Sequence, residues 1–277
     1  MVIRELYRKM QDVMSHNPNS DTAFEAGQLI EFVTGRKRIE VMGDEADGET
    51  VEKLMEYAQK RKEGYPLQYI LGRWQFFDME LCVGEGVLVP RQDTETVCEI
   101  AFEVIKTIEN PVVVDLCSGS GCIALAVKRF FPDADVTAVE KSDAAFGYLK
   151  KNIELTGFDI TAVQGDIFEY FTQPEKESVD VIVSNPPYID YSVKSQLQTE
   201  VGHEPEMALF ADDNGLVFYK FISHNYRYCL RDGGWLVFEY GYDQQSEVRN
   251  ILLEEGYTVV KEITDLGGNP RGVAARK

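Results

Sequence analysis

Two hydrophobic periodicities divide this chain. From residue 1 to about residue 64, apolar side chains recur three and four positions apart, as at Leu6, Met10 and Val13. This spacing puts them on one face of an α-helix, so the segment predicts a small bundle of amphipathic helices. Gly64 and Pro66 interrupt the pattern. We expect the helical bundle to end there.

The next residues alternate between apolar and polar side chains. In residues 74–89, Gly84-Glu85-Gly86 lies between two alternating arms. This pattern predicts a β-hairpin with its turn at these three residues. We therefore divide the chain into an N-terminal helical domain at residues 1–64, a linker with a β-hairpin at residues 65–92, and a larger domain at residues 93–277.

Helical and strand patterns alternate from about residue 94 to the end of the chain. Helices are expected over residues 94–106, 122–129 and 214–230, and strands near Val112, Val136, Ile160 and Val179 and over residues 234–239, 257–262 and 273–276. The last two could form an antiparallel pair. The alternation predicts an α/β fold with a mostly parallel seven-stranded sheet and helices on both faces, which binds ligands at the carboxyl ends of its strands.

A glycine turn follows the first of these strands and precedes a helix. Six residues of this motif are candidates for ligand contact: Asp115, Cys117, Ser118, Gly119, Ser120 and Gly121. Glycine permits a tight turn and a close approach of the backbone, and the N-terminus of the helix presents free N–H groups. Glu140 ends the next strand, where a carboxylate can accept both hydroxyls of a ribose.

The glycine turn by itself is compatible with two kinds of ligand. Gly119-x-Gly121-x-x-Ala124 followed by Glu140 also fits the fingerprint of a nicotinamide or flavin enzyme. Asp115 favours instead a nucleoside with a positively charged amino-acid tail, such as S-adenosylmethionine. Asp166 could accept from an adenine amine, with Ile167 covering the ring, or it could simply cap a short helix.

The sequence Asn185-Pro186-Pro187-Tyr188 follows the buried-looking strand near Val179. The prolines restrict the backbone, so the Asn185 side chain is held in one direction. Its oxygen and the Pro186 carbonyl form a pair of acceptors that matches the two N–H groups of a substrate amide or amine. Tyr188 adds a flat wall. The alternative is that these four residues are an ordinary turn.

In this order, the Asp115 motif, Glu140, Asp166 and Asn-Pro-Pro-Tyr resemble class I S-adenosylmethionine-dependent methyltransferases, and more closely the peptide chain release factor glutamine methyltransferases. Further similar segments extend the resemblance over nearly the whole chain after about Tyr65; they are residues 66–72, 74–77, 89–95, 203–209 and 265–271. Two residues depart from the family pattern: Cys117 replaces a usual glycine and Gln92 a usual proline. Cys117 is harmless if its backbone is extended.

The resemblance implies a Rossmann-like class I methyltransferase domain at residues 93–277. It also implies S-adenosyl-L-methionine as cofactor, S-adenosyl-L-homocysteine as product, and methylation of the N5 amide of the glutamine in the Gly-Gly-Gln motif of release factors. Asn185, Pro186 and Tyr188 would be catalytic, Pro187 would complete the substrate loop, and Asn185 would also contact the cofactor. The N-terminal helices would recognise the release factor. Residues 89–95 would close over the cofactor, or would simply begin a helix with Asp93 or Thr94 as its cap.

Charge bears on the main rival function, amino methylation of a nucleic-acid base. The chain has 28 basic and 47 acidic residues, a net charge of −19, which opposes binding to a phosphate backbone. We therefore expect a protein substrate and no direct nucleic-acid contact. Methylation of another protein amide, a nicotinamide oxidoreductase activity and a noncatalytic cofactor-binding role also stay open.

Cysteine, histidine and hydropathy patterns add expectations about metals and location. The five cysteines and three histidines have no metal-ligand spacing, so we expect no metal and reduced thiols. There is no apolar run of the ~18 residues that a membrane span needs. The first residues lack the apolar core of a signal peptide. We expect a cytoplasmic monomer.

Overall fold

The computed structural model describes residues 1–277 and separates into two compact units. One consists of Met1–Arg73 together with Leu197–His203, and the other of Trp74–Gln196 together with Glu204–Lys277. The division of the chain at residues 64 and 92 stays a prediction. We describe each unit by itself.

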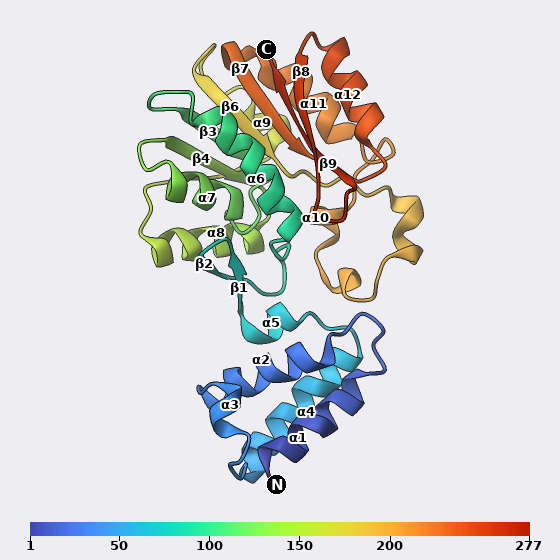
Figure 1. Cartoon of the computed structure of the whole chain (residues 1–277). Helices are drawn as coiled ribbons and strands as arrows, with labels where there is room; N and C mark the ends of the chain where they lie inside the picture. Colours follow the sequence, from blue (N-terminus) through green and yellow to red (C-terminus); the bar gives the residue numbers. More distant parts are fainter. The chain divides into compact units, whose positions relative to one another are not determined.

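The first unit is the predicted helical bundle (Figure 1). Asp21 caps α2 by accepting a hydrogen bond from the Phe24 N–H at 3.1 Å, and Asp47 caps α4 by accepting one from the Thr50 N–H at 2.8 Å. These caps satisfy backbone donors that the first helical turn leaves free. The helices are α1 (Ile3–Met14), α2 (Thr22–Thr34), α3 (Arg38–Val41), α4 (Gly48–Lys62) and α5 (Leu67–Leu71), and the unit also holds the 3₁₀ turn η2 (Val201–His203).

A buried ion cluster centred on Arg61 joins distant parts of this unit. The guanidinium is 1% exposed, and one of its nitrogens, Nη2, lies 2.7 Å from Glu25 Oε1 and 2.6 Å from Glu200 Oε1. The Asn17 amide donates to Glu200 at 3.2 Å. The cluster therefore ties residues 197–203 to α2 and α4, a long-range contact that no local pattern predicts.

The predicted hairpin is present, but its turn is elsewhere. Strands β1 (Arg73–Phe76) and β2 (Met79–Cys82) pair with each other, so the turn is Phe77-Asp78 and the prediction of Gly84–Gly86 was wrong. Phe77 takes φ 51°, an uncommon backbone for an aromatic residue. Its ring packs against Phe102 and Phe130 at 5.7 and 5.4 Å between centroids. Tertiary packing of this ring therefore holds the turn.

The second unit contains the predicted seven-stranded sheet, in the order β5-β4-β3-β6-β7-β9-β8. Strands β5, β4, β3, β6 and β7 are parallel, and β9 is antiparallel to both of its neighbours, as expected for the terminal pair. The α/β prediction is confirmed. The strands are β3 (Val112–Leu116), β4 (Asp135–Glu140), β5 (Thr161–Gln164), β6 (Val179–Ser184), β7 (Leu230–Glu239), β8 (Thr258–Thr264) and β9 (Pro270–Arg276).

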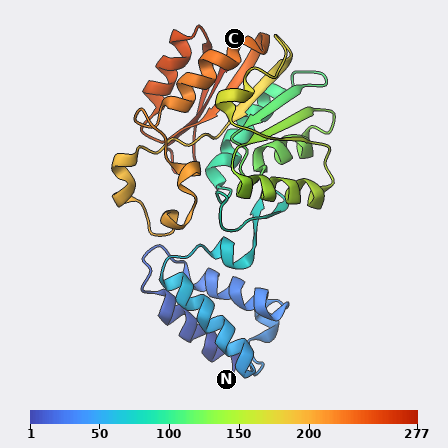
Figure 2. The same cartoon turned by 180° about the vertical axis from the view of Figure 1, so that it is seen from behind.

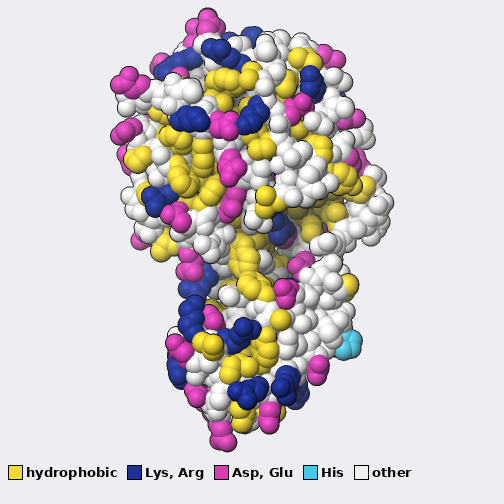
Figure 3. Space-filling view, in the orientation of Figure 1, with side chains coloured by type: hydrophobic (Ala, Val, Ile, Leu, Met, Phe, Trp, Pro, Cys, Tyr) yellow, Lys and Arg dark blue, Asp and Glu magenta, His cyan; other side chains and the backbone are white.

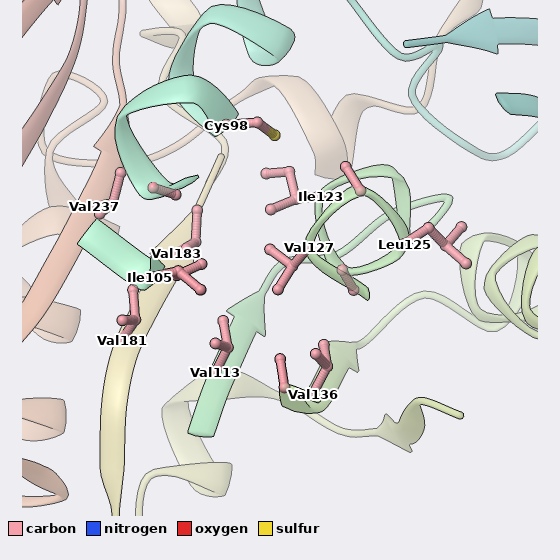
Figure 4. Packing of buried hydrophobic residues seen from close by; sticks show 14 of the residues in the cluster. Cys98, Ile105, Val113, Ile123, Leu125, Val127, Val136, Val181, Val183 and Val237 are labelled. Atoms are coloured by element: carbon pink, nitrogen blue, oxygen red, sulfur yellow. The ribbon is translucent and has the colours of Figure 1, made fainter. Parts of the chain in front are cut away.

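Alternate side chains of the buried strands point to opposite faces of the sheet. Val181 and Val183 pack with α6 and α7 on one face (Figure 4), whereas Ile182 packs with α11 and α12 on the other, which Figure 2 brings to the front. This two-residue period covers both faces with helices. The helices are α6 (Gln92–Ile105), α7 (Cys122–Phe130), α8 (Asp143–Thr156), α9 (Ile167–Tyr170), α10 (Glu206–Leu209), α11 (Val217–Asn225) and α12 (Gln245–Glu254), with 3₁₀ turns η1 (Tyr191–Gln196) and η3 (Tyr226–Tyr228).

The helix predicted over residues 214–230 is shorter than expected. Helix α11 begins at Val217 because Asp213, Asn214 and Gly215 have φ angles of 59°, 54° and 81°, which lie outside helical backbone geometry. A Cβ at Gly215 would lie 2.0 Å from the Tyr188 carbonyl oxygen. Glycine is therefore needed where this turn meets the Asn-Pro-Pro-Tyr loop.

The surface of the second unit mixes both signs of charge. Lys and Arg side chains are interspersed with Asp and Glu on the face that Figure 3 presents. None of the helices combines the length and the hydropathy that crossing a bilayer would require.

Candidate active site

The two predicted motifs meet where the strand order of the sheet reverses. From β3 the chain proceeds outward to β4 and β5, and then returns to β6 on the other side of β3. Leu116 of β3 pairs with Ser184 of β6, and the Ser184 hydroxyl donates to the Leu116 carbonyl at 2.7 Å. The glycine turn and Asn185 therefore leave the sheet side by side at its switch point, where open α/β sheets bind ligands.

A pocket of about 1010 Å³, including open solvent at its mouth, lies at this point. Nine predicted site residues line it, whereas Asp115, Gly121, Pro186 and Tyr188 do not. The nine are Cys117, Ser118, Gly119, Ser120, Glu140, Asp166, Ile167, Asn185 and Pro187. Val89, Pro90, Arg91 and Thr94 also line it. The roles of the individual residues stay predictions.

Glu140 is held by backbone N–H groups. Its Oε2 accepts from Gly119 N at 2.7 Å and its Oε1 accepts from Ser142 N at 2.7 Å. Burial raises the pKa of Glu140, against the lowering effect of these N–H groups. Each carboxylate oxygen keeps a lone pair for a further donor, so the side chain can accept from two vicinal hydroxyls.

The glycine turn is tightly curved and open toward the pocket. Gly119 and Gly121 have φ angles of 56° and 83°. A Cβ at Gly121 would lie 2.4 Å from a methyl of Leu149, whereas a Cβ at Gly119 would meet no atom within 4 Å. Gly119 therefore leaves space beside its backbone that a ligand can occupy.

Cys117 is not extended, contrary to the condition set by the sequence. Its φ is 61°, in the left-handed region where a residue with a Cβ is strained by about 1–2 kcal/mol. The turn needs this conformation to bring Ser118 back, so that its N–H donates to the Val139 carbonyl at 3.0 Å. This explains physically why glycine would suit the position.

Asp115 lies beneath the turn and supports it. The residue is 1% exposed, its Oδ2 accepts from the Ala124 N–H at 3.1 Å, and its Oδ1 has no hydrogen-bond partner. Burial raises its pKa to about 7. An unpartnered buried carboxylate oxygen next to the pocket suits a cationic group.

Asp166 both caps a helix and lines the pocket. Its Oδ1 accepts from Phe168 N at 3.0 Å at the start of α9, and its Oδ2 pairs with Lys141 Nζ at 2.8 Å. Burial raises its pKa, but the Lys141 ammonium and the Phe168 N–H outweigh that effect, so the pKa is lowered. The capping alternative is thus correct and compatible with a ligand role.

Asn185 contacts two buried residues: Thr94, from the 89–95 segment, and Glu239, which the sequence did not single out. Its Nδ2 donates to Thr94 Oγ1 at 3.2 Å, and its amide lowers the pKa of the Glu239 carboxylate as a hydrogen-bond donor does. Thr94 belongs to the first turn of α6, whose N-cap is Arg91, so neither Asp93 nor Thr94 is the cap. Glu239 ends an apolar strand, and a lone carboxylate at such an end was the signal that could have identified it.

The pocket fits S-adenosylmethionine in its chemistry. Glu140 offers two acceptors for ribose hydroxyls, Ile167 and Phe168 supply apolar cover for a ring, and the Gly119 backbone leaves open space. The fold and this site together define a class I methyltransferase.

Comparisons with known proteins identify the family. Residues 91–209 match the family described as Methyltransferase small domain, and residues 5–72 the family described as PrmC N-terminal domain. The chain belongs to the release factor glutamine methyltransferase family: it is 34% identical to a member from Salmonella typhimurium over 99% of this chain and 97% of that protein.

Other relatives agree with this assignment. A Streptomyces coelicolor member is 34% identical over 99% of this chain and 96% of that protein. A Fusobacterium nucleatum member is 37% identical over 82% of this chain, and the matched region covers 63% of that protein.

Solved structures support the fold. The hMettl16 catalytic domain in complex with an RNA hairpin matches with a TM-score of 0.58 at 16% identity, over 93% of this chain and 91% of that chain. A Thermus thermophilus 16S rRNA methyltransferase in complex with AdoMet and guanosine matches with a TM-score of 0.52 at 18% identity, over 74% of this chain and 49% of that chain.

Proposed function

We propose that this chain transfers the methyl group of S-adenosyl-L-methionine to the side-chain nitrogen, N5, of the glutamine in the Gly-Gly-Gln motif of peptide chain release factors. The observation that carries the proposal is Asn185 on the wall of the same pocket as Glu140 and Asp166. The names of the relatives supply the acceptor.

The pocket residues divide between cofactor and substrate. Glu140 would accept from the ribose hydroxyls, Asp166 from the adenine amine, and the turn from Cys117 to Gly121 would approach the amino-acid tail, with Asp115 beneath it. When bound, the cofactor supplies an electrophilic methyl group on a sulfonium.

Asn185 and the Pro186 carbonyl would hold the substrate. A carboxamide nitrogen is a poor nucleophile because its lone pair is delocalised into its carbonyl. Two acceptors that bind both of its N–H groups orient the nitrogen for in-line attack. They also stabilise the positive charge that develops on nitrogen. The surplus proton leaves after transfer, so the reaction requires neither a metal nor an obligatory general base.

The N-terminal helices would add contacts with the rest of the release factor. A three-residue motif offers far less than the roughly 800 Å² per partner that stable interfaces bury. Selection of one protein therefore needs a second surface. The 197–203 segment belongs to the same unit as α1–α4 and would share this role.

The net charge of −19 favours a protein acceptor over nucleic acid. We propose that the enzyme acts as a monomer in the cytoplasm, where its acceptor takes part in translation termination.

The test is transfer of labelled methyl from S-adenosylmethionine to a purified, unmodified release factor. A copy with the Gly-Gly-Gln glutamine replaced and a nucleic-acid sample are the controls. Label on the first acceptor alone is expected. Label on nucleic acid would favour the rival function, and label on both release factor copies would indicate a different protein amide.

A further inference from the structure

The geometry points to Glu239 and Thr94 as positioning residues that lock the Asn185 amide, with its nitrogen turned away from the substrate and its oxygen facing it. This inference rests on the proposed function for the nature of the substrate. It concerns the orientation of one side chain, which can be measured without any substrate.

The sheet register brings Glu239 next to Asn185. Ser184 of β6 pairs with Phe238 of β7 in parallel register, so the residues that follow them, Asn185 and Glu239, leave adjacent strands at the same level. Glu239 is 2% exposed and does not line the pocket, whereas Asn185 and Thr94 do. Glu239 therefore acts on the substrate only through its neighbours.

The hydrogen bonds among the three residues have one consistent direction. The Thr94 hydroxyl and the Asn185 amide both lower the pKa of Glu239, which is the effect of hydrogen-bond donors on a carboxylate, so the ionised Glu239 is the acceptor for both groups. The Thr94 oxygen, having donated its proton, accepts from Asn185 Nδ2 at 3.2 Å. Both contacts require nitrogen on the inner side of the Asn185 amide. The oxygen Oδ1 is left on the outer side.

Neighbouring groups both raise and lower the pKa of the buried Glu239 carboxylate. Burial raises its pKa to about 7, while Thr94, Arg271 and Asn185 lower it and Asp93 raises it. The Arg271 guanidinium lies 2.9 Å from Asp265 and 3.3 Å from Asp93. Tyr188, whose pKa burial raises, is the remaining titratable group of the substrate loop that faces it. Glu239 Oε2 has no hydrogen-bond partner.

Loss of this lock would let the Asn185 amide rotate by half a turn. The Asn185 NH₂ group would then face the two N–H groups of the substrate amide, so hydrogen-bond donors would face donors. The lone pair of the substrate nitrogen would no longer be oriented toward the methyl group. In Glu239→Gln the new amide can donate as well as accept, which removes the preference while keeping the volume. Thr94→Val removes the hydroxyl with little change in shape, and Thr94→Ser keeps it.

The experiment measures kcat, KM for the release factor, and cofactor affinity by calorimetry for these three variants. For Glu239→Gln we expect kcat to fall about 100-fold, because the misoriented Asn185 loses its fixed polar contact to the transition state. Cofactor affinity should change less than about 3-fold. Thr94→Val should lose kcat, and Thr94→Ser should restore it. Asp180→Asn is the matched control: this buried carboxylate at the opposite end of β6 pairs with Arg231, and its loss should leave kcat unchanged.

A second measurement follows the Asn185 side-chain NH₂ by ¹⁵N NMR, assigned by its disappearance in Asn185→Ala. It should exchange slowly with solvent in the unaltered protein and rapidly in Glu239→Gln and Thr94→Val. This readout stands even if no label reaches a release factor, so it separates the inference from the proposed function. Unaltered kcat in Glu239→Gln, or equal kcat in Thr94→Val and Thr94→Ser, would overturn the inference. If Glu239→Gln does not fold, the comparison of the two Thr94 variants decides.

Discussion

Asn185 and Glu239 stand at the same level on two adjacent parallel strands, one residue beyond the paired Ser184 and Phe238. The substrate loop is therefore supported by the end of β7 as well as by its own prolines. Replacing Asn185 with Ala should abolish turnover, because the acceptor that orients the substrate nitrogen is lost. Cofactor affinity, measured by calorimetry, should stay within a small factor. Asn225→Ala, which removes a hydrogen bond to the Phe221 carbonyl in α11, is the control. Equal loss of turnover and cofactor binding would refute this role.

Removing residues 1–64 should weaken methylation of the release factor and spare cofactor binding. The reason is that the helices supply contact area that the tripeptide lacks. The measurement is kcat/KM for the whole release factor and for a short Gly-Gly-Gln peptide. The deletion should lower the first much more than the second. Equal kcat/KM values for the deleted and full chains on the whole release factor would exclude a recognition role.

Arg61→Ala should destabilise the first unit by about 3–5 kcal/mol, since it leaves the buried Glu25 and the partly buried Glu200 without their cation. The neighbouring Lys60→Ala is the control. Its ion pair with Glu56 is exposed, so its loss should cost only about 0–0.5 kcal/mol. Urea unfolding of both variants gives the comparison. Equal losses of stability would show that burial does not strengthen the Arg61 cluster.

Asp115 makes stability depend on pH in a defined direction. Its pKa is raised to about 7 by burial, so between its unfolded value and 7 the native state holds a proton that the unfolded state has lost. The contribution of Asp115 to stability is therefore greatest below its unfolded pKa and falls as pH rises toward 7, by up to about 1.4 kcal/mol per pH unit. Unfolding at pH 5, 6 and 7 should show a smaller fall in Asp115→Asn. If stability falls with pH as steeply in Asp115→Asn as in the unaltered protein, groups other than Asp115 cause the pH dependence.

Cys117 carries backbone strain that two substitutions can separate. Because Cys117 has a φ of 61°, the Cys117→Gly substitution should relieve about 1 kcal/mol of backbone strain. Lost side-chain contacts and the greater freedom of glycine in the unfolded chain partly offset this gain. Cys117→Val should destabilise, because a β-branched side chain is poorly tolerated at positive φ. The Tm of thermal unfolding should therefore be higher for Cys117→Gly than for Cys117→Val. The opposite order would mean that side-chain packing, and not strain, governs this position.

The sequence by itself determined the features that depend on local pattern. The apolar run of β6 predicted a buried strand, and the alternation of helical and strand segments predicted a sheet with helices on both faces. The residues after β3 and β6 predicted the two halves of one site, since the carboxyl ends of parallel strands share an edge.

Only the tertiary structure decided the features that depend on contacts between distant residues. Ring packing of Phe77 set the hairpin turn, and the Arg61 cluster gathered residues 197–203 into the first unit. Thr94 and Glu239 lie far from Asn185 in the sequence and meet it through the helix start and the strand register. Such contacts carry no local periodicity, and the free energy that selects them comes from burial of the whole fold.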